Sequence, residues 1–121
     1  MRVELFKEFT FEAAHRLPRL PAEHKCSRLH GHSYRVAITV EGEVNAVTGW
    51  LMDYGEIQQA MQPLLDRHLD HAYLNEVKGL ENPTSENLAG WLWKKLKGRL
   101  PGLKRVSVYE TCTTGCHYEG R

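Results

Sequence analysis

Three histidines occupy positions from which strand geometry would turn their side chains to one side. His30 and His32 are separated only by Gly31, and residues two apart in an extended chain face the same way. His15 has the parity of the apolar residues in an earlier alternating segment. Three imidazoles without a fourth protein ligand are typical of an open, catalytic zinc site. The pattern predicts that His15, His30 and His32 bind Zn²⁺; the alternative is three ordinary buried histidines satisfied by hydrogen bonds.

Cys26 lies four residues before His30, which gives the motif C-x-x-x-H-G-H. As a fourth zinc ligand, Cys26 would close the site into a structural centre. As a free thiol beside a cation, it would serve as a base or nucleophile. We expect a catalytic thiol, because three histidines already supply the ligand count of a catalytic zinc; an inert loop cysteine is the third possibility.

Asp70 and His71 are adjacent in a segment that follows a predicted helix. A carboxylate beside an imidazole orients it and favours its charged form, which suits a proton relay to a thiol. We therefore count both as candidate catalytic residues. The alternative is an Asp-His pair that caps the end of the helix.

Glu110 has the parity of Val106 and Val108 on the buried face of a predicted strand. A lone buried carboxylate is costly unless it has a partner. A ligand that presents two parallel N–H donors would be such a partner, so Glu110 is a candidate catalytic and substrate-binding residue. The alternative is a buried pair with Arg or Lys.

Two further candidates stand at the predicted start of the second helix. Thr84 is a good N-cap and Glu86 would lie in the first turn. Complementarity with the helix dipole explains Glu86 without any function. Cys112, Cys116 and His117 lack the partners of a second metal motif.

The elements that must position these residues follow from periodicity. Alternation predicts strands over 2–14, 32–44, 105–112 and 116–120, and helical spacing predicts helices that start near Asp53 and Thr84. The order ββααββ favours an α+β architecture, a four-stranded antiparallel sheet with two helices on one face. Such a sheet leaves two edges exposed, so we expect an oligomer in which three subunits close a barrel.

Composition narrows the class of protein. The chain has 121 residues, 16 Lys+Arg against 15 Asp+Glu, and 41% hydrophobic residues. This fits a single domain, 1–121, with no charge excess for nucleic acid or a membrane surface. Three cysteines cannot all pair with one another in disulfides. The sequence has no apolar segment of the length expected for a membrane-spanning helix or a secretory signal peptide. We expect a cytoplasmic protein with free thiols.

The motifs together resemble one family. They are His15, the C-x-x-x-H-G-H run from Cys26 to His32, Leu69-Asp70-His71, Pro83-Thr84-Ser85-Glu86-Asn87 and Glu110-Thr111. Their order and spacing are similar to those of the 6-pyruvoyl tetrahydropterin synthase family, and most similar to its bacterial branch, the 6-carboxy-5,6,7,8-tetrahydropterin synthases of queuosine biosynthesis. A folate-pathway variant carries Glu two residues after the cysteine, where this chain has Arg28.

The resemblance implies a tunnelling fold in which trimers surround a twelve-stranded barrel and stack into a homohexamer. It implies Zn²⁺ on His15, His30 and His32, with Cys26 as catalytic base. Asp70 and His71 would come from a neighbouring subunit, and Glu110 would anchor the pterin, with Glu86 and Thr84 nearby. The implied reaction converts 7,8-dihydroneopterin triphosphate to 6-carboxy-5,6,7,8-tetrahydropterin with release of acetaldehyde and triphosphate.

The sequence is also compatible with three other functions. The chain could be a 6-pyruvoyl tetrahydropterin synthase acting on the same substrate, or a non-catalytic zinc-binding module. A zinc-hydroxide hydrolase would have no need of Cys26. Lys7, Lys25 and Arg28 are candidates to bind the triphosphate.

Overall fold

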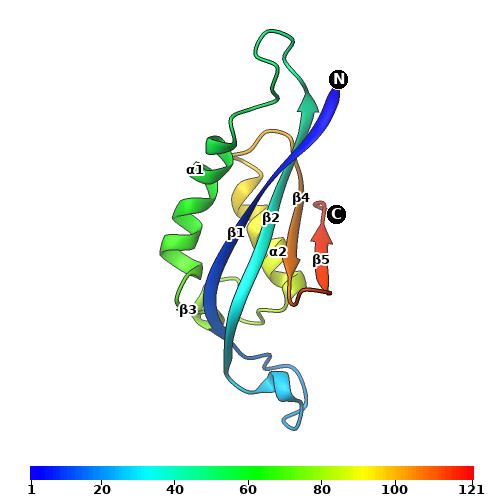
Figure 1. Cartoon of the computed structure of the whole chain (residues 1–121). Helices are drawn as coiled ribbons and strands as arrows, with labels where there is room; N and C mark the ends of the chain where they lie inside the picture. The colour runs from blue at the N-terminus through cyan, green and yellow to red at the C-terminus, as the bar shows by residue number, and fades with distance from the viewer.

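A five-stranded sheet forms the centre of the computed structural model, which describes all 121 residues. The strand order is β3-β1-β2-β4-β5. The two longest strands, β1 and β2, pair along the middle of the sheet (Figure 1). The strands are β1 (Arg2–His15), β2 (His30–Glu43), β3 (Ala72–Tyr73), β4 (Leu103–Tyr109) and β5 (Gly115–Tyr118). The α+β class predicted from the sequence is confirmed.

Two helices cover one face of this sheet, α1 (Tyr54–Leu64) and α2 (Ser85–Leu96). Both begin at the predicted caps: the Asp53 side chain accepts from Gly55 N, and the Thr84 side chain accepts from Asn87 N. A π-helical turn (Leu65–Leu69) extends α1 past Pro63. Short 3-10 turns, η1 (Lys25–Ser27) and η3 (Leu74–Glu76), lie in the connecting loops.

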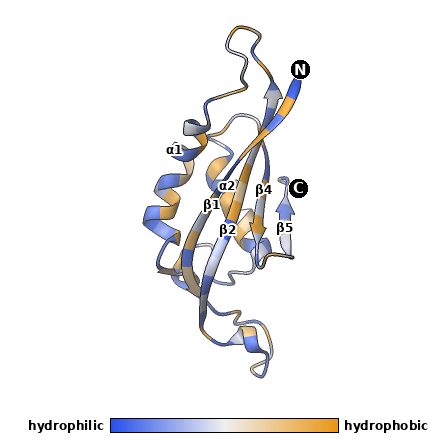
Figure 2. Cartoon of the chain, viewed as in Figure 1, coloured by the Kyte–Doolittle hydropathy of each residue, from blue (hydrophilic) through white to orange (hydrophobic).

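The alternation of apolar and polar residues along the strands determines which face of the sheet is buried. Odd residues of β1 and even residues of β2 and β4 enter one core cluster with both helices, in which Val36, Ile57, Leu92 and Val106 are fully buried. Hydrophobic residues of α2 and β4 gather where helix and sheet face each other (Figure 2). Apolar burial of this kind is the main stabilising term of the fold.

The opposite face of the sheet carries no helix and is charged. Glu8 Oε2 lies 2.7 Å from Arg35 Nη1, whose guanidinium stacks 3.9 Å from the centre of the Tyr109 ring. Arg105 pairs with Glu119 at 3.0 Å and with a second glutamate on β1. Cross-strand pairs of opposite charge suit a face that meets solvent or another polar surface.

The prediction of a four-stranded, all-antiparallel sheet is wrong in one respect. Ala72 and Tyr73 form β3, which pairs in parallel with Ala13 and Ala14 at the end of β1. The sheet is therefore mixed and has five strands. A two-residue strand is too short to produce an alternating pattern, so periodicity places these residues in a loop.

The remaining boundaries differ by a few residues. β1 and β2 reach His15 and His30, whereas β4 ends at Tyr109 and leaves Glu110 in the turn that follows. None of the helices has the length and apolar composition required to cross a bilayer.

Candidate metal and pterin site

The antiparallel register of β1 and β2 brings the three predicted histidines together. His15 pairs directly with His30, and Ala13 pairs with His32. Directly opposed residues in such a pair lie close and on the same face, so His15 and His30 meet, while His32 follows two residues along β2. The three ligand nitrogens all lie within 4.8 Å of one another. The predicted convergence of the three imidazoles is confirmed.

The spacing of the ring nitrogens fits a metal ion. His15 Nε2 lies 3.0 Å from His30 Nε2 and 3.3 Å from His32 Nε2. A tetrahedral zinc bound at typical Zn–N distances places its nitrogen ligands about 3.3 Å apart. Two bare nitrogen lone pairs would repel at these distances, whereas a cation between them removes the repulsion. The donor set therefore suits a metal ion held by three imidazoles.

Backbone carbonyls fix the orientation of all three rings. The Nδ1 atoms of His15, His30 and His32 lie 3.0, 2.8 and 3.0 Å from the carbonyl oxygens of Pro83, Arg28 and Ser33. A carbonyl only accepts, so each Nδ1 donates its N–H outward and the Nε2 atom of each ring is directed at the centre of the cluster. This is the outer hydrogen bonding by which proteins orient metal-ligating histidines.

Burial favours the neutral form of His15, the central imidazole of the cluster. His15 is 3% exposed, and desolvation lowers its pKa below the ordinary value. Tyr34 stacks on His32, with ring centres 4.0 Å apart, and on Phe11 at 4.9 Å. Burial, followed by the charge of Glu110, raises the pKa of Tyr34, so its hydroxyl stays protonated. That hydroxyl is buried without a hydrogen-bond partner.

Glu110 lies beside the histidine cluster, in the turn that follows β4. Its Oε2 is 3.9 Å from His32 Nε2, and its side chain is 34% exposed. The Ser85 hydroxyl, at the start of α2, donates to Glu110 Oε1 at 2.5 Å. Neither Lys nor Arg forms an ion pair with Glu110, so the alternative of a buried pair with a cation is not what the chain forms. One carboxylate oxygen is held by Ser85 and the other faces the cluster.

The two candidates at the start of α2 differ in position. The Thr84 hydroxyl accepts from Asn87 N as the helix cap. Glu86 is exposed in the first turn and lines a hollow along α2 with Trp91 and Tyr118. The hydrogen bond to Glu110 comes from Ser85, between them. The segment Pro83–Ser85 thus contacts both the histidine cluster and Glu110.

Cys26 lies in η1, within the loop that joins His15 to His30. The Leu17 N–H donates to its carbonyl at 2.8 Å, which closes the loop near its base. The half-buried thiol is free and makes no hydrogen bond within the chain, and it does not belong to the group of possible metal ligands. The geometry matches a thiol separate from the ligand set.

Asp70 and His71 contact each other, as a relay requires. His71 Nδ1 lies 3.1 Å from Asp70 Oδ1, which also accepts from Glu12 N at 3.1 Å. That backbone hydrogen bond, more than His71, lowers the pKa of Asp70. His71 adopts a left-handed backbone (φ 59°) and its side chain is 80% exposed.

The exposed ring of His71 lines a shallow hollow of ≈ 370 Å³ together with His32 and Gly31. A Cβ at Gly31 would make only ordinary contact, 3.5 Å from Ala13 O. Packing within the chain therefore does not require glycine there. The missing side chain instead leaves the hollow open beside the histidine cluster. No hydrogen bond links His71 to Cys26 within one chain.

Comparison with known proteins agrees with this geometry. The family model described as 6-pyruvoyl tetrahydropterin synthase matches residues 4–121. The chain belongs to this family. A protein named 6-carboxy-5,6,7,8-tetrahydropterin synthase from Synechocystis is 46% identical over 119 residues, 94% of this chain and 91% of that protein. A dihydroneopterin monophosphate aldolase from Pyrococcus furiosus is 32% identical, covering 98% of this chain and 99% of that protein.

The fold matches a solved structure of the same family. The 6-pyruvoyl tetrahydropterin synthase of Caenorhabditis elegans has a TM-score of 0.89 and 29% identity over 100% of this chain and 97% of its own. The likeness includes the mixed sheet and both helices, and the histidine cluster is consistent with the metal site of this lyase family.

Sequence reasoning missed three contributors to the site. Ser85 stands in the Pro83–Asn87 motif without a role of its own, because a serine in a first helical turn is common for its capping chemistry alone. The contact of the Pro83 carbonyl with His15 cannot be predicted from residue types, because every residue has a backbone carbonyl. Tyr34 reads as an ordinary core aromatic on the strand; its place two residues after His32 was the available signal.

Proposed function

We propose that this chain is a zinc-dependent 6-carboxy-5,6,7,8-tetrahydropterin synthase. It converts 7,8-dihydroneopterin triphosphate to 6-carboxy-5,6,7,8-tetrahydropterin and releases acetaldehyde and triphosphate, a step of queuosine biosynthesis. The observation that carries the proposal is the three-imidazole cluster with Glu110 beside it, in a chain 46% identical to a protein of that name.

His15, His30 and His32 would hold the zinc through Nε2, and the three carbonyls that accept from Nδ1 orient the rings for this. The cluster supplies three protein ligands and no fourth, which is the donor set of zinc sites that leave a position for substrate or water. Zinc supplies Lewis-acid polarisation of the substrate side-chain oxygens there.

Glu110 binds the amidine-like edge of the pterin ring, for which a carboxylate is the matching bidentate acceptor. Ser85 holds Oε1 of Glu110 in place, so the carboxylate is oriented before the substrate arrives. Thr84 and Glu86 are the neighbours of Ser85 in the sequence; the Thr84 hydroxyl caps the helix, and Glu86 lines the hollow along α2.

Cys26 is the general base that removes a proton from a side-chain carbon of the substrate. Its place in the loop between His15 and His30, outside the ligand set, supports this role. A relay of His71 and Asp70 accepts that proton. No hydrogen bond joins either residue to Cys26 within one chain, which supports a relay supplied by a neighbouring subunit, as in the family the chain resembles.

The exposed sheet edges support an assembly that supplies this neighbour. Beyond Ala13 and Ala14, the outer side of β1 has no strand partner, and β5 forms the other edge. Unpaired edges favour pairing with further strands. Trimers that join these edges close a barrel around the charged face of the sheet, and two trimers form the hexamer. The lining side chains of that face, Arg35 and Arg105 among them, are already satisfied by glutamates.

The proposal is tested by incubating the zinc-loaded protein with 7,8-dihydroneopterin triphosphate and analysing the products by mass spectrometry. Equal amounts of acetaldehyde and 6-carboxy-5,6,7,8-tetrahydropterin are expected. A 6-pyruvoyl product without acetaldehyde would place the chain in the other branch. Pterin binding without turnover in the assembled protein would reduce it to a binding module.

A further inference from the structure

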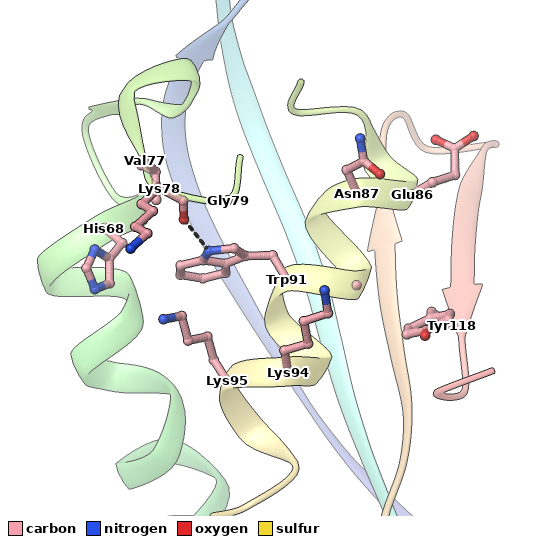
Figure 3. A pocket seen from close by; sticks show the side chains of 11 residues that line it. His68, Val77, Lys78, Gly79, Glu86, Asn87, Trp91, Lys94, Lys95 and Tyr118 are labelled. Atoms are coloured by element: carbon pink, nitrogen blue, oxygen red, sulfur yellow. Dashed lines mark hydrogen bonds between the residues drawn. The ribbon is translucent and has the colours of Figure 1, made fainter. Parts of the chain in front are cut away.

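A second hollow lies away from the histidine cluster, along the outer side of α2. It has a volume of ≈ 820 Å³, and its walls come from α2, the 77–79 loop, the turn after α1 and Tyr118 of β5 (Figure 3). A smaller hollow of ≈ 150 Å³ shares two of its lining residues, His68 and Lys95. The two hollows adjoin at these residues, and we call them together the helix groove.

The helix groove concentrates positive charge. Its lining includes five permanent cations and a single carboxylate, Glu86: the cations are Arg67, Lys78, Lys94, Lys95 and Arg99. None of these five forms an ion pair. The sheet cations Arg35, Lys104 and Arg105, by contrast, all pair with glutamates. Other cations, such as Lys7 and Lys97, also form no ion pair, so the helix groove is set apart by gathering five cations around one carboxylate in a chain with a net charge of only +1.

Helix electrostatics accounts for only part of this pattern. Lys94 and Lys95 occupy the last turn of α2, where the helix dipole favours cations. Lys78 comes from a loop and Arg67 from the turn after α1, and neither belongs to the C-terminal turn of α2. Three separate segments therefore supply the cations that line the two adjoining hollows.

A buried indole fixes the geometry at the centre of the groove. Trp91 is 7% exposed, and its Nε1 donates to Lys78 O at 3.0 Å. Lys95 Nζ lies 5.4 Å from the centre of the ring, and the His68 ring meets its edge with centres 5.7 Å apart. Figure 3 shows His68, Lys78 and Lys95 gathered around this indole. The Lys78 carbonyl is held by Trp91, and Lys95 lies over the indole ring. Groups that are already held in place lose less entropy when they bind a ligand.

These features indicate the chemistry of a ligand. Ammonium and guanidinium groups without carboxylate partners suit phosphate oxygens. The covered faces of Trp91 offer no platform for stacking a base, so recognition rests on charge alone. The positive charge is confined to this short groove, and the rest of the chain is net negative, which favours a short anion over a long nucleic acid.

We propose that the helix groove is a binding site for a small polyanion of the linear oligophosphate class. The site is separate from the histidine cluster and does not depend on the proposed synthase activity.

The test titrates the full protein with inorganic triphosphate while following the indole N–H resonance of Trp91. The chain has three tryptophans, and Trp50→Phe and Trp93→Phe assign the other two signals. A saturable shift of the Trp91 signal is expected. This reporter distinguishes the groove from any triphosphate bound near the histidine cluster.

Matched variants localise the site. Lys78→Gln and Lys95→Gln should each weaken binding about tenfold or more, the loss of one charge-assisted hydrogen bond. Lys97→Gln removes the same charge from an exposed position at the end of α2, outside the lining, and should change affinity less than about twofold. Thermal melts verify that each variant is folded.

Three results would overturn the proposal. They are an unchanged Trp91 signal at saturating triphosphate, equal weakening by Lys97→Gln, and saturation by single-stranded RNA but not by triphosphate. The second would indicate diffuse surface charge, and the third a macromolecular partner.

Discussion

The contact between Ser85 and Glu110 makes a quantitative prediction about substrate binding. Replacing Ser85 with Ala removes a hydrogen bond of 2.5 Å to a carboxylate that is two-thirds shielded. Hydrogen bonds to charged groups contribute about 1.5–3 kcal/mol. We therefore expect Ser85→Ala to lower kcat/KM by roughly 10- to 150-fold, chiefly through KM, with zinc content unchanged.

A double-mutant cycle separates orientation of Glu110 from a general effect of the substitution. If Ser85 acts through Glu110, then Ser85→Ala should have little further effect once Glu110 is replaced by Gln. Ser85→Thr keeps the hydroxyl and should restore most of the affinity. Pterin affinity, measured by titration calorimetry, and kcat/KM are determined for the parent, the two single variants and the double variant. Fully additive losses would refute the reasoning, because they would show that Ser85 and Glu110 act independently.

Three further predictions concern stability and its dependence on pH. Tyr34→Phe removes a buried hydroxyl without a partner and should leave the free energy of unfolding unchanged or raise it by about 1 kcal/mol; a clear loss in denaturant unfolding would reveal a missing partner. Leu92→Ala opens a cavity at a fully buried site and should cost about 2–5 kcal/mol in the same assay. Asp70 has a folded pKa below its ordinary value because Glu12 N donates to it, so its contribution is present above the unfolded pKa and is lost as pH falls through the folded pKa. As the pH is lowered below about 4, the melting temperature of Asp70→Asn should therefore fall less steeply than that of the parent protein. Equal slopes of melting temperature against pH in the two proteins would contradict this.

Local patterns in the sequence were sufficient for the main architecture. Alternation in β1 and β2 gave the face of each residue, and that parity placed His15 and His32 on the core side. Capping chemistry located the starts of both helices at Asp53 and Thr84. Period and capping are properties of short segments, so they are visible without tertiary information.

Contacts between distant segments were not visible. β3 depends on where the chain returns to the end of β1, and the bond from His15 to the Pro83 carbonyl joins residues 68 apart. The partner of Glu110 is Ser85 because β4 and α2 pack together, which no pattern around either residue records. Such pairs depend on the path of the loops and not on local preference.

The central claim is that three imidazoles bind the zinc while Cys26 remains outside the ligand set. The most direct test is the metal content of purified Cys26→Ala, measured by plasma mass spectrometry beside its turnover. The account predicts one zinc per chain, as in the parent, with turnover reduced by about 10²- to 10⁴-fold; His30→Ala, as the matched control, should lose the zinc. Loss of zinc from Cys26→Ala would contradict the claim and make Cys26 a ligand.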